Sequence, residues 1–153
     1  MKMIRENVKI LQAGKEDIDD ILRLGKKFED ALKASRLKRA HFHEKEEFLD
    51  FIKNPGENVF LVAKVDKKLA GFIYARILSE DWCMIDNLAV EKEYQKRGIG
   101  TMLIEELYKI LQKRKISYIQ ILEEIHHKQT RKFWHDKGFR EEKVFVWADK
   151  WLR

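Results

Sequence analysis

The chain has 153 residues, of which 44% are hydrophobic and 38% charged, and its formal net charge is +6. This length suits one domain with a real hydrophobic core but is short for two, and the composition excludes a disordered chain. We therefore expect residues 1–153 to form a single domain. The positive charge favours an anionic partner, such as a phosphorylated cofactor, an acidic protein or nucleic acid.

Signals for export and membrane insertion are missing from the sequence. No apolar run approaches the length that spans a membrane, and the first residues lack the apolar core of a signal peptide. The single cysteine, Cys83, excludes an internal disulfide. We expect a cytoplasmic protein without a membrane partner. Because no His or Asn lies at a known motif distance, Cys83 is predicted to be a buried structural thiol, not an acyl-accepting nucleophile.

The first half of the chain predicts an α/β pattern. In chain order we expect a strand at 7–13, a helix at 17–34, a basic connector at 35–45, a helix at 44–53, and a hairpin of strands at 59–65 and 69–77. The connector contains His41 and His43 beside Glu44. Without a second ligand cluster, these residues do not predict a metal site.

The second half adds the remaining elements. We expect a central strand at 84–90, a helix from 100 to about 114, a strand at 116–122, a helix at 127–137 and two short strands within 139–152. The helix after Gly100 carries one apolar stripe, made of Leu103, Ile104, Leu107, Ile110 and Leu111. A strand–helix–strand unit of this kind predicts parallel strands with a right-handed connection.

The junction between the central strand and the next helix predicts an anion site. It reads Gln95-Lys96-Arg97-Gly98-Ile99-Gly100. The first N–H groups of a helix have no internal partner, and the helix dipole favours negative charge there. The two glycines allow an anion to approach the backbone closely, and Lys96 and Arg97 add charge. The spacing fits neither a P-loop nor a dinucleotide fingerprint.

This junction matches Q/R-x-x-G-x-G/A, with Leu88-x-Val90 before it and Phe133-Trp134-His135-Asp136-Lys137-Gly138-Phe139 after it. In these motifs, and in the order of its elements, the chain resembles the GNAT superfamily of N-acetyltransferases. The resemblance implies a mixed α/β domain with helices on both faces of a central sheet of six to seven strands. It also implies that strands 4 and 5 are parallel and splay apart at one end.

The resemblance implies acetyl-CoA as the co-substrate and no metal. The pantetheine arm of acetyl-CoA would lie between the two strands where they separate, against the backbone of Leu88, Ala89 and Val90. Its pyrophosphate would be held by the turn and helix start, which comprise Gln95, Lys96, Arg97, Gly98, Ile99, Gly100 and Thr101.

The implied reaction is direct attack of an amine on the thioester. A backbone N–H at or near Leu88 would stabilise the oxyanion. Asp86 is the candidate general base, acting directly or through a water, and the alternative is that this carboxylate only binds the substrate's cation. Glu123 and Glu124 are rival candidates, although both also fit a solvated turn.

The proton donor is where the sequence departs from the family pattern. Trp134 occupies the position of the usual tyrosine, and an indole N–H cannot shuttle a proton at neutral pH. The thiolate could leave unassisted, or Tyr118, His126 or His127 could protonate it. Trp134 then serves as core packing or as a wall of the acyl pocket. His127 also replaces the family's usual asparagine, which removes one cofactor contact.

The acceptor is the least determined partner. Residues 26–51 are expected to line the acceptor site. The acceptor amine could belong to a small molecule or to a protein. The positive net charge disfavours a polycation. A non-catalytic acyl-CoA binder is the alternative function. The basic run 33–45 suggests a third hypothesis, a nucleic-acid-binding module, but the sequence contains no RNA- or DNA-binding signature. Residues near the C-terminus, which are Val144, Phe145, Val146, Trp147 and Trp151, suit a homodimer interface or a core.

Overall fold

The computed structural model describes residues 7–34, 45–146, 148, 150 and 152, with the backbone alone over 28–34. Two compact units are present, Met1–Ile121 and Leu122–Arg153, and each is described by itself. The connector 35–44, with His41 and His43, and the residues Trp147 and Trp151 lie outside the described part. The single domain expected for residues 1–153 stays a prediction.

The first unit contains the strands and helices that the sequence predicts, in the predicted order, with bounds that differ by at most two residues. Its elements are β1 (Val8–Gln12), a 3-10 turn (Lys15–Asp17), α1 (Ile18–Ala34), α2 (Lys45–Lys53), β2 (Val59–Val65), β3 (Lys68–Ile77), β4 (Trp82–Val90), a second 3-10 turn (Lys92–Tyr94), α3 (Ile99–Lys113) and β5 (Tyr118–Ile121). The second unit contains α4 (Lys128–Asp136).

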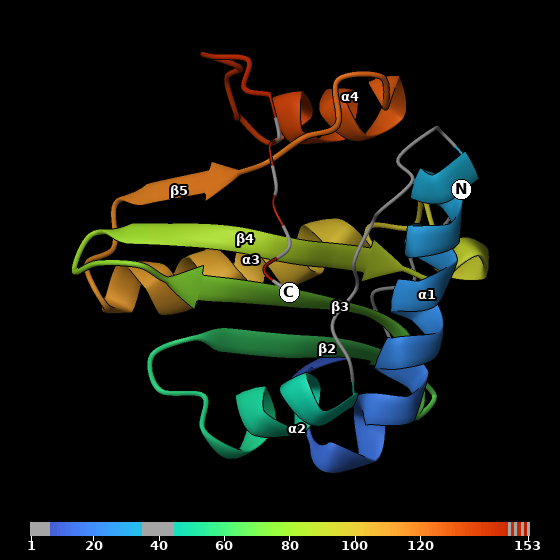
Figure 1. Ribbon diagram of the computed structural model, residues 1–153. Coiled ribbons are helices and arrows are strands. Elements are labelled where there is room, and N and C mark those ends of the chain that lie inside the picture. Colours follow the sequence, from blue (N-terminus) through green and yellow to red (C-terminus); the bar gives the residue numbers. More distant parts are fainter. Residues whose placement is uncertain (1–6, 35–44, 147, 149, 151, 153) are drawn as a thin grey trace. The chain divides into compact units, whose positions relative to one another are not determined.

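The five strands form one sheet in the order β1-β2-β3-β4-β5. The first four strands pair antiparallel, and β4 and β5 pair parallel through the crossover helix α3. Figure 1 shows α1 and α2 on the near side of this sheet and α3 behind it. The mixed sheet, the helices on both faces and the parallel pair are therefore confirmed.

The prediction of six to seven strands is wrong, because the described residues form five. The difference lies in residues 139–152, where two short strands were expected. Val144, Phe145 and Val146 have β-forming side chains, but they are 80%, 74% and 91% exposed. A strand is stabilised by a paired ladder and by packing of one face, and no described residue pairs with this run.

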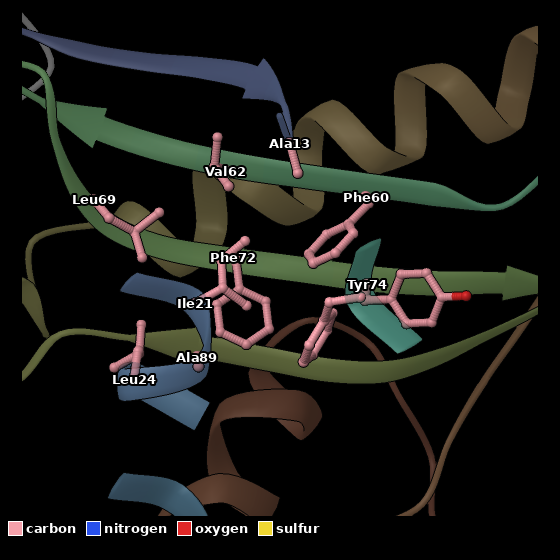
Figure 2. Packing of buried hydrophobic residues seen from close by; sticks show 10 residues of the cluster. Ala13, Ile21, Leu24, Phe60, Val62, Leu69, Phe72, Tyr74 and Ala89 are labelled. Atoms are coloured by element: carbon pink, nitrogen blue, oxygen red, sulfur yellow. The ribbon is translucent and has the colours of Figure 1, made fainter. Parts of the chain in front are cut away.

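Side chains alternate between the two faces of the sheet along each strand, and an apolar layer forms on each face. The near layer packs α1 and α2 against the sheet, as Figure 2 shows for Ile21 and Leu24 of α1 beside Phe72 and Ala89. Phe48 of α2 is fully buried there and lies 5.5 Å from Phe60, centroid to centroid. On the other side, the buried stripe of α3 comprises Ile99, Leu103, Ile104, Leu107 and Leu111. This packing fixes the sheet that presents the site.

None of the helices in the described part of the chain combines the length and apolar character that crossing a bilayer requires.

Close contact between β3 and β4 depends on Gly71. A Cβ at this position would lie 2.7 Å from the carbonyl oxygen of Ala89 and 3.3 Å from Cα of Val90. We predict that Gly71→Ala forces the strands apart at the C-terminal end of β4 and lowers the free energy of unfolding by about 1–3 kcal/mol. Chemical denaturation measures this change.

Gly56→Ala is the comparison variant, because a Cβ added at Gly56 would meet no atom within 4 Å. That variant should lose stability only through the strain of its positive φ of 54°. Full stability in Gly71→Ala would contradict the close contact at Gly71.

Candidate functional site

The site begins where the parallel ladder stops. β4 and β5 pair from Trp82–Tyr118 to Ile85–Ile121, and β5 ends there. β4 continues through five more residues, Asp86 to Val90, of which Asn87 to Val90 remain paired with β3 on the other side. Along this extension the edge of β4 that faced β5 has lost its partner strand. Backbone N–H and C=O groups on that edge are available to pair with an extended ligand.

The direction of these groups follows from the antiparallel ladder. The N–H of Glu91 donates to the carbonyl oxygen of Ala70 at 2.8 Å, so Glu91 points its backbone toward β3. Because alternate residues face opposite sides, Ala89 also faces β3, whereas Leu88 and Val90 face the open edge. The side-chain amide of Gln95 confirms this direction for Val90, since its Nε2 donates to the Val90 carbonyl oxygen at 3.0 Å.

Asp86 is the extra residue of a β-bulge. In the register of β3 with β4, Tyr74 lies opposite Asn87 and the next residue, Ala75, lies opposite Ile85. A bulge bends its strand and redirects a side chain, which is why such features recur beside functional sites. The bulge therefore marks the point at which β4 leaves β5.

The carboxylate of Asp86 is held by Arg76 of β3. The Nε of Arg76 donates to Oδ2 and its Nη2 donates to Oδ1 at 2.9 Å. The hydrogen bond to Asp86 raises the pKa of the Arg76 guanidinium. Burial, with a contribution from the Asp86 charge, raises the pKa of the neighbouring Tyr74 hydroxyl. Sequence reasoning identified Asp86 but not this partner.

The turn after β4 has the geometry of an anion-binding loop. Lys96 and Gly98 both adopt left-handed conformations, with φ of 58° and 86°. Left-handed residues interleaved with others turn successive backbone N–H groups toward one side, which forms a concave nest for an anion. Gly98 is the N-cap of α3 and no side chain caps the helix there. Its first N–H groups are thus left for a ligand.

A buried carboxylate that the sequence analysis missed anchors the end of β4. Glu91 is 7% exposed. Its two oxygens accept from two cations of α1, Arg23 Nη1 at 2.9 Å and Lys27 Nζ at 2.8 Å. Glu91 directly follows the residues predicted to bind the pantetheine arm and precedes the turn. These two ion pairs fix the helix, the strand and the turn in one place.

The second unit holds the remaining sequence candidates. Glu124 stabilises the turn before α4, because its Oε2 accepts from the N–H of His126 at 3.0 Å. Burial, and secondarily the charge of Glu141, raises the pKa of the Glu123 carboxyl. Trp134 packs between two aromatic rings, 5.2 Å from Phe133 and 5.1 Å from Phe139, centroid to centroid. This contact accounts for Trp134 as local core packing.

Three comparisons with known proteins bear on this geometry. Residues 25–139 match the model of the acetyltransferase (GNAT) family. The chain belongs to the GNAT family. It is 26% identical over 149 residues to an uncharacterized N-acetyltransferase of Methanocaldococcus jannaschii, covering 91% of this chain and 62% of that protein. The chain thus spans less than two thirds of that relative's length.

Two solved GNAT-fold structures show the same architecture. The PaiA N-acetyltransferase of Thermoplasma acidophilum, solved with coenzyme A, is 22% identical, covers 90% of this chain and 92% of its own, and has a TM-score of 0.75. An aminoglycoside acetyltransferase from an uncultured soil metagenomic sample, solved with sisomicin, is 19% identical, covers 98% and 99%, and has a TM-score of 0.74. At these identities the likeness shows the fold alone.

Residues 25–139 thus form a domain of the acetyltransferase (GNAT) family. Within the described residues, no group of three or more His, Cys, Asp or Glu side chains has the arrangement of a metal site. The residues assigned to cofactor and catalysis stay predictions, which the following variants test.

Gly100→Asp tests the anion site at the start of α3. We predict that this carboxylate repels a diphosphate and lowers affinity for CoA by at least 100-fold, since it adds charge repulsion in the first turn of the helix. Calorimetric titration with CoA measures the loss. Gly100→Ala is the matched control, which adds a Cβ without charge and favours the helix. Unchanged CoA affinity in the Asp variant would remove the pyrophosphate from this turn.

Cys83 provides a pH-dependent prediction. The thiol is buried, and this burial raises its pKa to about 11. At pH 8 only about one thiol in a thousand is the reactive thiolate. We predict no measurable reaction of the native protein with a disulfide reagent over the time of an assay, and one thiol per chain after denaturation. Rapid labelling at pH 8 without denaturant would contradict the burial.

Proposed function

We propose that the protein transfers an acetyl group from acetyl-CoA to a primary amine. One observation carries this proposal. The five residues of β4 beyond Ile85 have no strand on the edge that β5 occupied, and the chain then continues into α3, whose N-terminus has no side-chain cap. An extended amide-bearing arm with a diphosphate at one end matches this pair of features. The arm would lie along Leu88, Ala89 and Val90, with the backbone groups of Leu88 and Val90 facing it. Gln95, Lys96, Arg97, Gly98, Ile99, Gly100 and Thr101 would surround the diphosphate.

The positions of Val90 and Gln95 refine that assignment. The Val90 carbonyl already accepts from the Gln95 side chain, so this residue offers its N–H to the arm, and Gln95 contributes chiefly by holding the turn. The Leu88 backbone faces the open edge just beyond the bulge. Its N–H is the donor proposed for the oxyanion.

The reaction needs no covalent enzyme intermediate. The neutral amine attacks the thioester carbonyl carbon, and the new C–N bond places negative charge on the carbonyl oxygen. Collapse breaks the C–S bond, and the sulfur leaves with the electron pair as the CoA thiolate. The amine loses one proton to a base before attack and a second from the nitrogen of the tetrahedral intermediate.

Asp86 is the proposed base. It lies at the bulge, two residues before Leu88, and its side chain is 16% exposed. Although Arg76 occupies one site on each carboxylate oxygen, a carboxylate offers about four acceptor sites in total. Asp86 can therefore accept an amine hydrogen while it remains paired. Glu124 is less suited, because the turn before α4 uses its carboxylate.

The departing thiolate is proposed to leave without an acid. Tyr118 pairs opposite Trp82, three residues before the ladder ends, which corresponds to about 10 Å along the strand. Its side chain is 53% exposed and faces solvent. Thiols are acidic enough to leave as anions at neutral pH. His126 and His127 remain the other candidates for a donor.

The second candidate function is acyl-CoA binding without turnover. It is favoured by Trp134, because the residue at the family's usual tyrosine position is an indole engaged with Phe133 and Phe139. CoA binding with no acyl transfer to any amine would select this alternative. Release of CoA thiol only in the presence of an amine would select the transferase.

Asp86→Ala separates the two roles of this carboxylate. We predict that it lowers kcat by about 100- to 1,000-fold with little change in CoA affinity, because the general base is lost. Thiol release and calorimetric titration measure the two quantities. Asp86→Asn should lower kcat by a similar factor, although its amide oxygen still offers Arg76 a hydrogen-bond acceptor. Glu105→Ala, which removes an exposed carboxylate of α3, is the control.

Unchanged kcat in both Asp86 variants would discard this residue as the base. A rise in KM for the amine with kcat preserved would instead assign it to binding of the substrate's cation.

A further inference from the structure

Polar side chains surround Met84 on the face of the sheet that carries α1 and α2. The ladder places Arg76, Met84 and Gln120 in one row across β3, β4 and β5. Cross-strand partners point to the same face, and residues two apart in a strand do so as well. Trp82 and Tyr118 therefore share this face, and their rings lie 6.2 Å apart, centroid to centroid. Asp86 joins the group through its bonds to Arg76.

An open hollow of about 410 Å³ adjoins this group, lined by Asp81, Trp82, Tyr118 and Gln120. Two of the side chains that line it also carry a buried polar atom with no hydrogen-bond partner among the described residues, Trp82 Nε1 and Gln120 Oε1. Asn87 Oδ1, beside the bulge, is likewise buried without a partner among those residues. A buried polar group without a partner costs free energy, so a polar ligand that reached these atoms would gain by pairing with them.

Arg76 keeps donor capacity for such a ligand. Its side chain is 45% exposed although Asp86 and Met84 both contact it. Nε and Nη2 donate to Asp86, and Nη2 also approaches Met84 Sδ at 3.6 Å. Within the described part of the chain, Nη1 has no partner. A guanidinium with a remaining edge binds a second carboxylate readily, since its planar fork matches that geometry.

We infer that the acceptor is a small amino carboxylate, a molecule that carries a carboxylate beside its primary amine. Its carboxylate binds Arg76 and its amine binds Asp86, while the remainder occupies the hollow beside Trp82 and Tyr118. The inference rests on the proposed acetyl transfer and names the substrate class of that same site. Because Arg76 and Asp86 are hydrogen-bonded to each other, Nη2 to Oδ1 at 2.9 Å, a ligand whose carboxylate and amine are neighbours can contact both side chains at once.

The charges of the site distinguish this class from a polycation. An amine without a carboxylate shares Asp86 with Arg76 and leaves the remaining edge of the guanidinium without a partner. An amino carboxylate brings one group of each sign, so both protein charges keep a partner. Like charges brought together in a partly buried site lower affinity, whereas paired charges do not.

The test compares acceptors that differ only in the carboxylate. Three matched pairs are assayed by thiol release from acetyl-CoA: phenylalanine with phenethylamine, leucine with isopentylamine, and glutamine with 4-aminobutanamide. We expect kcat/KM for each amino acid to exceed that of its amine by 10-fold or more. Sisomicin, a polycation, should be a poorer acceptor than any of the amino acids.

Arg76 variants then assign the preference to this residue. In Arg76→Gln we expect the ratio of kcat/KM, amino acid over amine, to fall by about 10- to 100-fold, which corresponds to a lost hydrogen-bonded charge contact. Arg76→Lys keeps the charge but not the fork and should give an intermediate ratio. Arg140→Gln removes an exposed arginine elsewhere and should leave the ratio unchanged. Circular dichroism and thermal melting verify that each variant folds.

Binding of phenylalanine and phenethylamine, measured by thermal shift with and without CoA, provides a readout that needs no turnover. Phenylalanine should stabilise the native protein and fail to stabilise the folded Arg76→Gln variant. Amines preferred over amino acids, a ratio insensitive to Arg76, or no binding of any amino acid would each overturn the inference. Arg76-dependent binding without CoA binding or transfer would overturn the proposed function and keep the amino carboxylate site.

Discussion

The structure depends on a mismatch in length between two parallel strands. β4 and β5 share four paired positions, after which β4 runs on alone at that edge. An unpaired strand edge carries backbone donors and acceptors that must meet water or a ligand, because leaving them buried and unpaired is costly. The fold thus presents one open edge of backbone groups. The extended arm proposed for this edge would be recognised by strand geometry, with no side chain required.

The extension of β4 needs support, because a strand paired on one side only is weakly held. The structure supplies it at both ends of the five-residue segment. At the start, the bulged Asp86 is bonded to Arg76 of the neighbouring strand. At the end, Glu91 bonds to Ala70 through its backbone and to Arg23 and Lys27 through its side chain. Gly71 allows the two strands to approach between these anchors. The segment is therefore ordered before any ligand arrives, which lowers the entropic cost of binding.

The parts of the fold that the sequence predicted have short-range causes. The periodic apolar stripe of α3, the hairpin of β2 and β3, and the glycine turn are all encoded within a few residues. The family motifs extended this to the parallel pair, whereas the cofactor residues that they imply stay predictions. The hairpin turn itself uses Asp66 and Lys67 at φ of 49° and 69°, a left-handed pair more often built with glycine, so its exact type was not evident.

The parts that the sequence did not predict depend on distant contacts. Arg76 and Asp86 are ten residues apart, and Lys27 and Glu91 are 64 apart, and no local pattern joins either pair. The two strands expected within 139–152 are absent from the described residues, because a favourable local sequence is not sufficient to form a strand. Val144 to Val146 have the local propensity of a strand, but a strand also needs a partner, which local sequence does not supply. Side-chain pairing and sheet size were thus beyond sequence reasoning, while element type and the position of the glycine turn were not.

Under the proposed reaction, the ion pair at the bulge would link the choice of acceptor to the chemistry. Asp86 would take an amine hydrogen while Arg76 stays bonded to it, so the guanidinium would lie beside the reacting nitrogen. A simple amine that arrives as an ammonium would be repelled by this charge and would leave the remaining edge of Arg76 without a partner. An amino carboxylate would supply that edge with a carboxylate, and the contact would be kept in the transition state. One arginine would then position the proposed base and select the substrate, and discrimination would appear in kcat/KM and not in cofactor affinity.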